Sequence, residues 1–409
     1  HRDLHSFPTR RSSDLVDQLE ARLAALDGRV TALENKPDKV TGNIIWRAGS
    51  AELYDFRWIG DVENAPSKGF FPYGWERFSN MDVKINVDGL IAEGVPGHIQ
   101  IWRPDRTYDW DTRGTYIHEA WLEFDNNWLG DTHIRMGQQF HKSLCGLTFD
   151  NDLYPLESAK ANFDFGDVDL TAMWGTIYDN NDPIGYGRLG WQVSSRFNVG
   201  ASYVPNAVNS EERWGLDAQY TGMSIPFFGL KADACFEFAE LQKDTNGYEP
   251  DNENQAMLAR LGLYKGDKEP GDACLTLSWG QAQENYIPQL TSIQPYNWFV
   301  EYSGLNWDYL LFNDAMPIAG SQIWAAEFTK RFGNTDVLLG WRQYNPWDDS
   351  TVQLTPWGPA QTDNVNIYQI QLTHPLTDGV DATVTYGRAD FDMFDDTRDY
   401  FSGSIDVLF

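Results

Sequence analysis

The sequence predicts an all-β fold class, a transmembrane antiparallel β-barrel of about 16–20 strands that follows a short α-helical coiled coil. From residue 43 onward, stretches of about ten residues alternate in side-chain character, as strands that cross a bilayer do. Short and long connections alternate between these stretches. Ahead of them, apolar residues recur at intervals of three and four, which is typical of a coiled coil. The expected domains are residues 1–15, 16–36, 37–42 and 43–409.

The first segment, HRDLHSFPTRRSSDL (residues 1–15), resembles a sequencing adapter translated in one reading frame. It is basic, like the start of a signal peptide. However, it lacks both the apolar run of about 7–15 residues and the small-residue cleavage site that a signal peptide needs. We therefore expect residues 1–15 to be an artefact that replaced the natural N-terminus and has no structural role.

Residues 16–36 carry a heptad repeat. Its apolar seam at positions a and d consists of Val16, Leu19, Leu23, Leu26, Val30 and Leu33. Arg22 and Arg29 then fall at g, while Asp27 and Glu34 fall at e, which is the charge pairing of parallel helices. Proline cannot continue a helix, so Pro37 ends this one, and residues 37–42 are expected to be a linker.

Two sequence patterns bear on the number of helices in this coiled coil, and they favour different numbers. Valine at a with leucine at d favours a dimer. RVTALE, at residues 29–34, resembles the Arg-apolar-x-x-apolar-Glu pattern of short trimeric coiled coils. We expect a homotrimer. The alternative to a coiled coil is a single amphipathic helix that packs on a globular domain.

Composition excludes some classes of function. The chain has 31 Lys and Arg against 60 Asp and Glu, a net charge of −29, so it has no basic surface with which to bind nucleic acid. No apolar run approaches the roughly 18 residues of a membrane-spanning helix. The three cysteines (Cys145, Cys235 and Cys274) have no metal-ligand spacing and cannot all pair, so no disulfide framework is implied.

The predicted strands include NMDVKINVDGLIAEG, TYIHEAWLEFDN, GLKADACFEFAEL, SQIWAAEFTKRF, NVNIYQIQLTH and GVDATVTYGRADF. Turn residues occupy the short connections WLGD, FGDV, FNVG, FGNT and LTDG. Long acidic connections such as RPDRTYDWDTRG and QKDTNGYEPDNENQ alternate with them. Short turns at one end and long loops at the other are typical of outer-membrane barrels. A soluble β-sandwich or propeller is the alternative, but no repeat of about 40 residues is present.

The C-terminal stretch RDYFSGSIDVLF alternates in the same way. Phe401, Ile405, Val407 and Phe409 fall on one face, and mostly polar residues fall on the other. This pattern resembles the C-terminal assembly signal of bacterial outer-membrane proteins, whose last strand ends in an aromatic residue. The resemblance implies recognition by the barrel-assembly machinery and contact with outer-membrane lipid.

A coiled coil followed directly by a large acidic barrel resembles the porins that carry an S-layer-homology domain in some diderm bacteria. In that family a signal peptide and a wall-binding domain precede the coiled coil. The resemblance implies a trimer in the outer membrane, a coiled coil in the periplasm, and a tether to peptidoglycan or another cell-wall polymer through a lost N-terminal domain.

The segment HKSLCGLTFDNDLYPLES, at residues 141–158, is the candidate pore constriction, because in many porins the loop at this point folds into the lumen. By that resemblance the candidate residues are Lys142, Asp150, Asp152 and Glu157. An exposed loop is the alternative. His141 and Ser143 have the His-x-Ser spacing of an outer-membrane phospholipase family, but the chain is too long for that family and no third polar partner is evident, so no catalytic residues are assigned.

No cofactor and no metal site are expected. The acidic clusters Asp105/Asp109/Asp111, Asp348/Asp349 and Asp390/Asp392/Asp395/Asp396 are candidates for Ca²⁺ or Mg²⁺ bound between loops, but none has EF-hand spacing and a solvated acidic surface is the simpler interpretation.

The sequence therefore predicts a porin, not an enzyme, for small hydrophilic solutes or ions, with a preference for cations if enough acids face the lumen. Two alternatives remain. One is a secreted Trp-rich protein that binds or hydrolyses carbohydrate, and the other is a tether whose barrel is only an anchor.

Overall fold

The computed structural model describes a large part of the barrel region. The described residues are 39–52, 75–92, 94–103, 115–126, 131–151, 155–177, 180–207, 211–226, 228–243, 254–266, 272–283, 286, 320–346, 364–391 and 396–409. Residues 1–38 are not among them. The predictions for residues 1–15, for the whole coiled-coil seam and for the start of the linker at 37–38 therefore lie outside the described residues. No helix among the described residues is long and apolar enough to cross a membrane.

Eighteen strands make up the described part of the chain. The first nine are β1 (Lys39–Glu52), β2 (Trp75–Ala92), β3 (Val95–Arg103), β4 (Tyr116–Asn126), β5 (Asp131–Gln139), β6 (Leu156–Asp164), β7 (Val168–Ile177), β8 (Asn180–Ser194) and β9 (Phe197–Ala207). The second nine are β10 (Glu211–Ile225), β11 (Leu230–Lys243), β12 (Gln255–Tyr264), β13 (Cys274–Ala282), β14 (Ser321–Phe332), β15 (Thr335–Pro346), β16 (Val365–Thr377), β17 (Val380–Phe391) and β18 (Asp396–Leu408).

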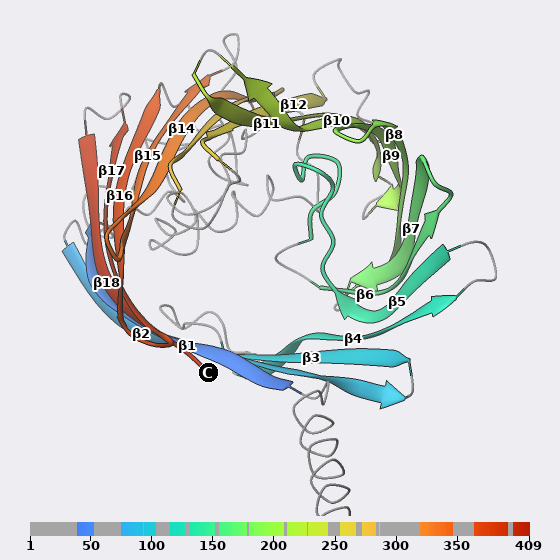
Figure 1. The fold of residues 1–409 in the computed structure, drawn as a ribbon, viewed down its shortest axis with the longest axis horizontal. Helices are drawn as coiled ribbons and strands as arrows, with labels where there is room; N and C mark the ends of the chain where they lie inside the picture. Colours follow the sequence, from blue (N-terminus) through green and yellow to red (C-terminus); the bar gives the residue numbers. More distant parts are fainter. Residues whose placement is uncertain are drawn as a thin grey trace, which may run out of the picture.

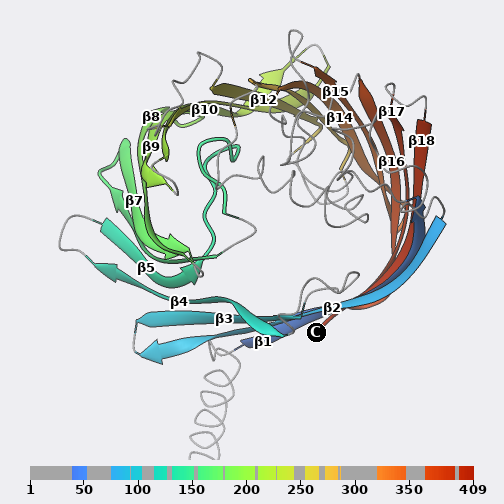
Figure 2. The same cartoon turned by 180° about the vertical axis from the view of Figure 1, so that it is seen from behind.

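These strands form one closed antiparallel barrel, within the predicted range of strand number. Each strand pairs with the next along the chain, and β1 also pairs with β18, with Asn43 opposite Leu408 and Ala51 opposite Tyr400. Figures 1 and 2 show the resulting ring from its two ends, with β1 beside both β2 and β18. Closure gives the backbone of the first and last strands hydrogen-bond partners, which a bilayer cannot supply.

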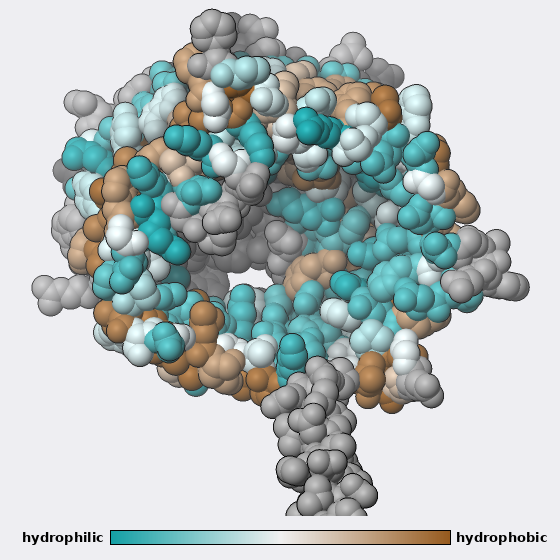
Figure 3. Space-filling view, in the orientation of Figure 1, coloured by the Kyte–Doolittle hydropathy of each residue, from teal (hydrophilic) through white to brown (hydrophobic). Residues whose placement is uncertain are grey.

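The two faces of the wall differ as the alternating pattern predicts. On β16, Tyr368, Ile370 and Leu372 are exposed on the outer face. Gln371 and Thr373 lie on the other face, where Thr373 Oγ1 is 3.0 Å from Thr383 Oγ1 of β17. In Figure 3 hydrophilic residues border the opening of the ring, and hydrophobic residues lie on its outside. An apolar outer face around a polar interior is the arrangement of a barrel that sits in a membrane.

The connections follow the predicted alternation with exceptions at both ends of the barrel. Tight turns join β14 to β15 and β16 to β17, while residues 53–74 and 347–364 separate strands at the other end. Three connections at that other end are also short, because only residues 178–179, 208–210 and 392–395 lie between the strands there, and at the turn end residues 265–273 form a longer connection.

Two boundaries differ from the sequence predictions. β1 begins at Lys39, so residues 39–42, expected to be linker, are strand: Gly42 pairs with Ile85 of β2. FNVG, expected to be a turn, forms the start of β9, because the turn lies two residues earlier, at Ser195 and Arg196.

The last strand has the predicted polarity. Phe401, Ile405, Val407 and Phe409 alternate with Ser402, Ser404 and Asp406, and the two phenylalanines are 48% and 54% exposed on the outer face. The final residue takes part in closure, because Phe409 N donates to Gly42 O at 3.0 Å and Gly42 N donates to Phe409 O at 2.9 Å.

We predict that Phe409→Ser lowers the fraction of folded barrel in the membrane and that deletion of Phe409 lowers it further. The substitution removes an outward aromatic ring, whereas the deletion also removes the last two hydrogen bonds of the seam. The measurement is heat-modifiable electrophoretic mobility of the membrane fraction. Ser404→Ala, on the lumen face of the same strand, is the control. Equal folded fractions in all variants would refute an assembly role for Phe409.

Candidate functional site: a loop folded into the lumen

The connection between β5 and β6 leaves the wall and enters the ring (Figures 1 and 2). Its described residues 140–151, which we call the lumen loop, form a compact hairpin-like turn. Ser143 N donates to Phe149 O at 2.8 Å, and Asn151 N donates to His141 O at 3.3 Å. At the tip, Gly146 has a φ of +84°, which glycine adopts without the steric cost of a side chain.

A single carboxylate on the barrel wall anchors the lumen loop. Glu237 of β11 is buried, and its Oε1 accepts from Ser143 Oγ at 2.7 Å and from the Thr148 backbone N–H at 2.8 Å. Its Oε2 accepts from the Cys145 backbone N–H. Charge-assisted bonds of this kind are stronger than neutral ones, and three of them meet at one side chain. Glu237 therefore fixes the backbone of the loop rather than just one of its side chains.

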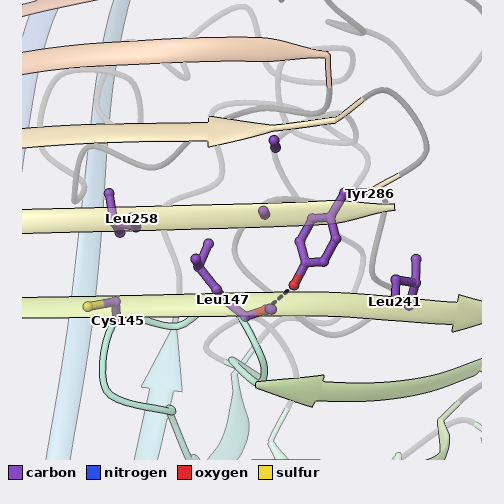
Figure 4. Close-up of a cluster of buried hydrophobic side chains, with 8 residues drawn as sticks. Cys145, Leu147, Leu241, Leu258 and Tyr286 are labelled. Atoms are coloured by element: carbon purple, nitrogen blue, oxygen red, sulfur yellow. Dashed lines mark hydrogen bonds between the residues drawn. The ribbon is translucent and has the colours of Figure 1, made fainter. Parts of the chain in front are cut away.

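An apolar patch made by the inner wall together with Tyr286, which follows β13, packs against the loop. This docking patch consists of Ala239, Leu241, Ala256, Leu258, Ala282 and Tyr286. Cys145 and Leu147 of the loop lie on it, both fully buried, and Tyr286 Oη donates to Leu147 O at 2.7 Å (Figure 4). Burying a leucine-sized side chain contributes about 1.5–3 kcal/mol, so these contacts favour the docked loop.

A second apolar cluster holds the other limb of the loop. Phe149 packs with Leu156, Met173, Ile184 and Tyr186, which belong to β6, β7 and β8. The rings of Phe149 and Tyr186 are 5.3 Å apart, and the ring of His141 is 4.5 Å from that of Tyr186. The lumen loop is thus held on two sides, by β6–β8 and by β11–β13.

A glycine on the wall makes room for this close approach. Gly215 of β10 faces the loop, and a Cβ placed on it would collide with Thr148 Oγ1. Next to it, Arg213 Nη1 donates to Thr148 O at 2.8 Å from a fully buried side chain. The wall at β10 is therefore shaped to receive Thr148.

The four predicted constriction residues have three different placements. Lys142 and Asp150 lie together on the lumen loop, where Lys142 Nζ is 3.2 Å from Asp150 Oδ2 and the Asp150 side chain has no exposed surface. Glu157 was placed wrongly: on β6 it alternates with buried Leu156 and Ser158, so it is exposed on the outer face of the barrel. Asp152 lies outside the described residues.

The inward loop favours the predicted constriction over the alternative of an exposed loop, but Asp150 does not have the expected role. Its carboxylate is buried and paired with Lys142, so it stabilises the loop and presents no open charge to a passing ion. The His-x-Ser pair is not a nucleophile and base, because Ser143 Oγ donates to Glu237 while the His141 ring packs against Tyr186.

Charged side chains on the lumen wall form ion pairs between strands, and one of these pairs spans an intervening strand, β9. Arg188 of β8 binds Asp217 of β10 through two nitrogens at 2.7 and 2.9 Å. Arg135 of β5 binds Glu123 of β4 at 2.9 and 3.0 Å. On β2–β4, acids outnumber bases on the lumen face, which carries Asp82, Asp88, Glu119, Glu123 and Asp125 beside Lys84.

In the described ranges, no group of three or more His, Cys, Asp or Glu side chains is arranged to hold a metal ion. Most of the acidic clusters noted as candidates for Ca²⁺ or Mg²⁺ fall outside those ranges. Asp390 and Asp396 fall inside them, and Asp390 accepts from Arg388 Nε at 3.1 Å.

Sequence reasoning missed Glu237 and the docking patch, although the sequence contains a signal for the patch. On β11, Ala239 and Leu241 occupy lumen positions while Phe236 and Phe238 occupy outer positions, so both faces are apolar there. A lumen position that faces water is normally polar. A local loss of alternation in a barrel strand therefore indicates that something covers the inner face.

No protein-family model matches the chain, and no curated protein sequence matches it. Its fold resembles solved structures of Pseudomonas aeruginosa outer-membrane porins. OccK8 (OprE) is 10% identical with a TM-score of 0.57, and the match covers 91% of this chain and 98% of that one. OpdQ is 9% identical with a TM-score of 0.57, covering 90% and 97%. OpdK, solved with vanillate, is 9% identical with a TM-score of 0.55, covering 91% and 98%. At these identities the similarity is one of fold alone.

We predict that Gly215→Val displaces the lumen loop and raises single-channel conductance and its noise. The new side chain occupies the space of Thr148 Oγ1, and overpacking of this kind costs about 1–3 kcal/mol. The measurement is conductance in a planar bilayer. Gly187→Val is the matched control, because a Cβ at Gly187 of β8 meets open space. The same conductance change in both variants would argue against loop displacement as its cause.

We predict that mild acid destabilises the docked loop through His141. Burial, with help from Lys160 and Arg188, lowers the pKa of His141 from 6.5 to about 3. The docked state therefore binds no proton at pH 5 while an undocked, solvated His141 does, so docking weakens as pH falls below 6.5, by about 2 kcal/mol at pH 5.

The measurement for His141 is the frequency of conductance fluctuations at pH 7 and pH 5. His141→Phe keeps an aromatic ring against Tyr186 and removes the titrating group, so its fluctuations should change much less between the two values. An equal increase in both proteins would assign the effect to other groups.

Proposed function

We propose that the chain is an outer-membrane porin through which small hydrophilic solutes and ions diffuse passively. The observation that carries this proposal is a structured loop held inside a closed barrel, which narrows the lumen without filling it. Figure 3 shows an opening through the ring beside hydrophilic residues. A wet, polar passage inside an apolar outer wall is what diffusion of hydrophilic solutes requires.

We further propose a preference for cations, carried by the lumen face of β2–β4. Asp88 and Glu119 lie on either side of His98, whose Nδ1 is 2.6 Å from Asp88 Oδ1 and whose Nε2 is 3.5 Å from Glu119 Oε2. In Figures 1 and 2 these strands lie across the ring from the docking patch on β11 and β12. Carboxylates that border a narrow passage raise the local concentration of cations and repel anions.

A trimer tethered to the cell wall is also part of the proposal. It rests on the heptad repeat of residues 16–36 and on the resemblance to porins with an S-layer-homology domain. Three copies joined by a parallel coiled coil would place three pores side by side.

The closed barrel argues against the alternative of a secreted, Trp-rich carbohydrate-binding protein. Trp46, Trp174 and Trp191 are about half exposed, but each lies on the outer face among apolar neighbours rather than in a groove lined with carboxylates. That outer position suits contact with lipid.

We predict that the purified protein conducts in a planar bilayer, in steps of three if it is a trimer. Under a salt gradient the reversal potential should show faster passage of cations. Asp88→Asn combined with Glu119→Gln should lower the cation-to-anion permeability ratio about two-fold, equivalent to about 0.4 kcal/mol in relative barrier height. The preference should also shrink in 1 M salt, where the screening length falls to about 3 Å.

Glu157→Gln is the matched control for these variants, because Glu157 carries the same charge on the outer face. Absence of any conductance would contradict the porin proposal and favour the structural tether. Conductance with a preference for anions would leave the porin proposal standing and refute the assignment of selectivity to β2–β4.

A further inference from the structure

We propose that Cys145 and Cys235 form a disulfide that fastens the lumen loop to the barrel wall. The two residues are 90 positions apart in the sequence, yet their Sγ atoms lie 3.3 Å apart. Cys145 is on the loop and Cys235 is on β11, and both are free thiols in the structure. A bond between them would join the loop covalently to the wall on which it rests.

The backbone contacts around Glu237 explain why the two sulfur atoms meet. Cys235 and Glu237 are two positions apart on β11, so their side chains share the lumen face. The Cys145 N–H donates to Glu237, which places the Cys145 side chain over the neighbouring Cys235. Leu147, two residues further along the loop, is held by Tyr286. The two sulfurs therefore lie close together because hydrogen bonds hold the loop backbone in place, and not because of the rotamer of one side chain.

The two sulfur atoms need only a small movement to reach bonding distance. A disulfide has an S–S bond of about 2.05 Å, so the sulfurs must approach by about 1.2 Å, which small side-chain rotations and a slight shift of the loop can supply. No strand has to change its pairing for this. Cys274, the third cysteine, lies on β13 at the end of its pairing with β12, where its sulfur contacts Thr276 Oγ1 at 4.0 Å. Cys274 therefore serves as the control cysteine, which we expect to remain a thiol.

The surroundings also define an order of reaction. Cys235 is partly exposed, whereas Cys145 is fully buried, so an oxidant reaches Cys235 first. The Cys235 thiolate attacks the disulfide of an envelope thiol oxidant, forming a mixed disulfide and releasing one oxidant thiolate. The Cys145 thiolate then attacks Cys235 Sγ and releases the second. Two protein thiols are oxidised to one disulfide, their two protons pass to the two released oxidant thiolates, and the oxidant disulfide is thereby reduced to two thiols.

The compartment supports this reaction. The inference rests on the outer-membrane location in the proposed function, because a chain bound for that membrane passes through the oxidising periplasm, where disulfides form and persist. The bond would keep the loop across the lumen under conditions that weaken its non-covalent docking.

The decisive experiment is differential alkylation of the full chain, exported behind a signal peptide in a diderm bacterial host. Envelopes are denatured in an alkylating agent without reductant, digested, and analysed by mass spectrometry. We expect a linked Cys145–Cys235 peptide pair in most molecules and alkylated Cys274. Alkylation of all three cysteines, or a bond that includes Cys274, would overturn the proposal.

Matched samples make this result specific. The same chain from a host strain that lacks its periplasmic thiol oxidase should show Cys145 and Cys235 alkylated, and Cys145→Ser should show Cys235 alkylated. In bilayers, a reductant should raise conductance noise in the wild type and in Cys274→Ser but not in Cys145→Ser. The peptide assay does not depend on conductance, so linked peptides in a protein that fails to conduct would uphold the disulfide while refuting the porin proposal.

Discussion

Every backbone N–H and C=O of a strand inside a bilayer needs a partner, because the hydrocarbon offers none. In this barrel that requirement falls hardest on β1 and β18, which meet only when the other strands are in register. The seam runs from Ala51 opposite Tyr400 to Gly42, which exchanges two hydrogen bonds with Phe409. Once the ring closes, strand alternation fixes which side chains meet lipid and which line the lumen, and the interior becomes a place where a loop can dock.

The lumen loop depends on features spread over distant strands. Glu237 receives three donors from the loop, the docking patch covers its apolar side chains, and Gly215 leaves space for Thr148. Without the loop, Glu237 would exchange these three partners for water, and the apolar docking patch would be exposed to the aqueous lumen, which is unfavourable. The loop and the wall therefore form one structural unit that narrows the passage.

The same arrangement separates structural charges from charges available to solutes. Asp150 and Glu237 are buried and bonded within the loop–wall contact, and Asp217 is bound by Arg188. The Asp88 side chain, by contrast, keeps 44% of its surface accessible on the opposite wall. A net charge of −29 therefore does not translate directly into selectivity, because each acid counts only according to where it lies and what it binds.

The sequence by itself determined the all-β barrel class, the range of strand number and the outward face of the last strand, because these depend on a period of two that each strand carries locally. It also indicated the segment at 141–158 as a constriction, through resemblance. Only the tertiary structure decided that Glu157 faces outward, since register and not composition sets the face of a strand. It alone brought Cys145 to Cys235 and Ser143 to Glu237, contacts about 90 residues apart that arise only when the ring closes.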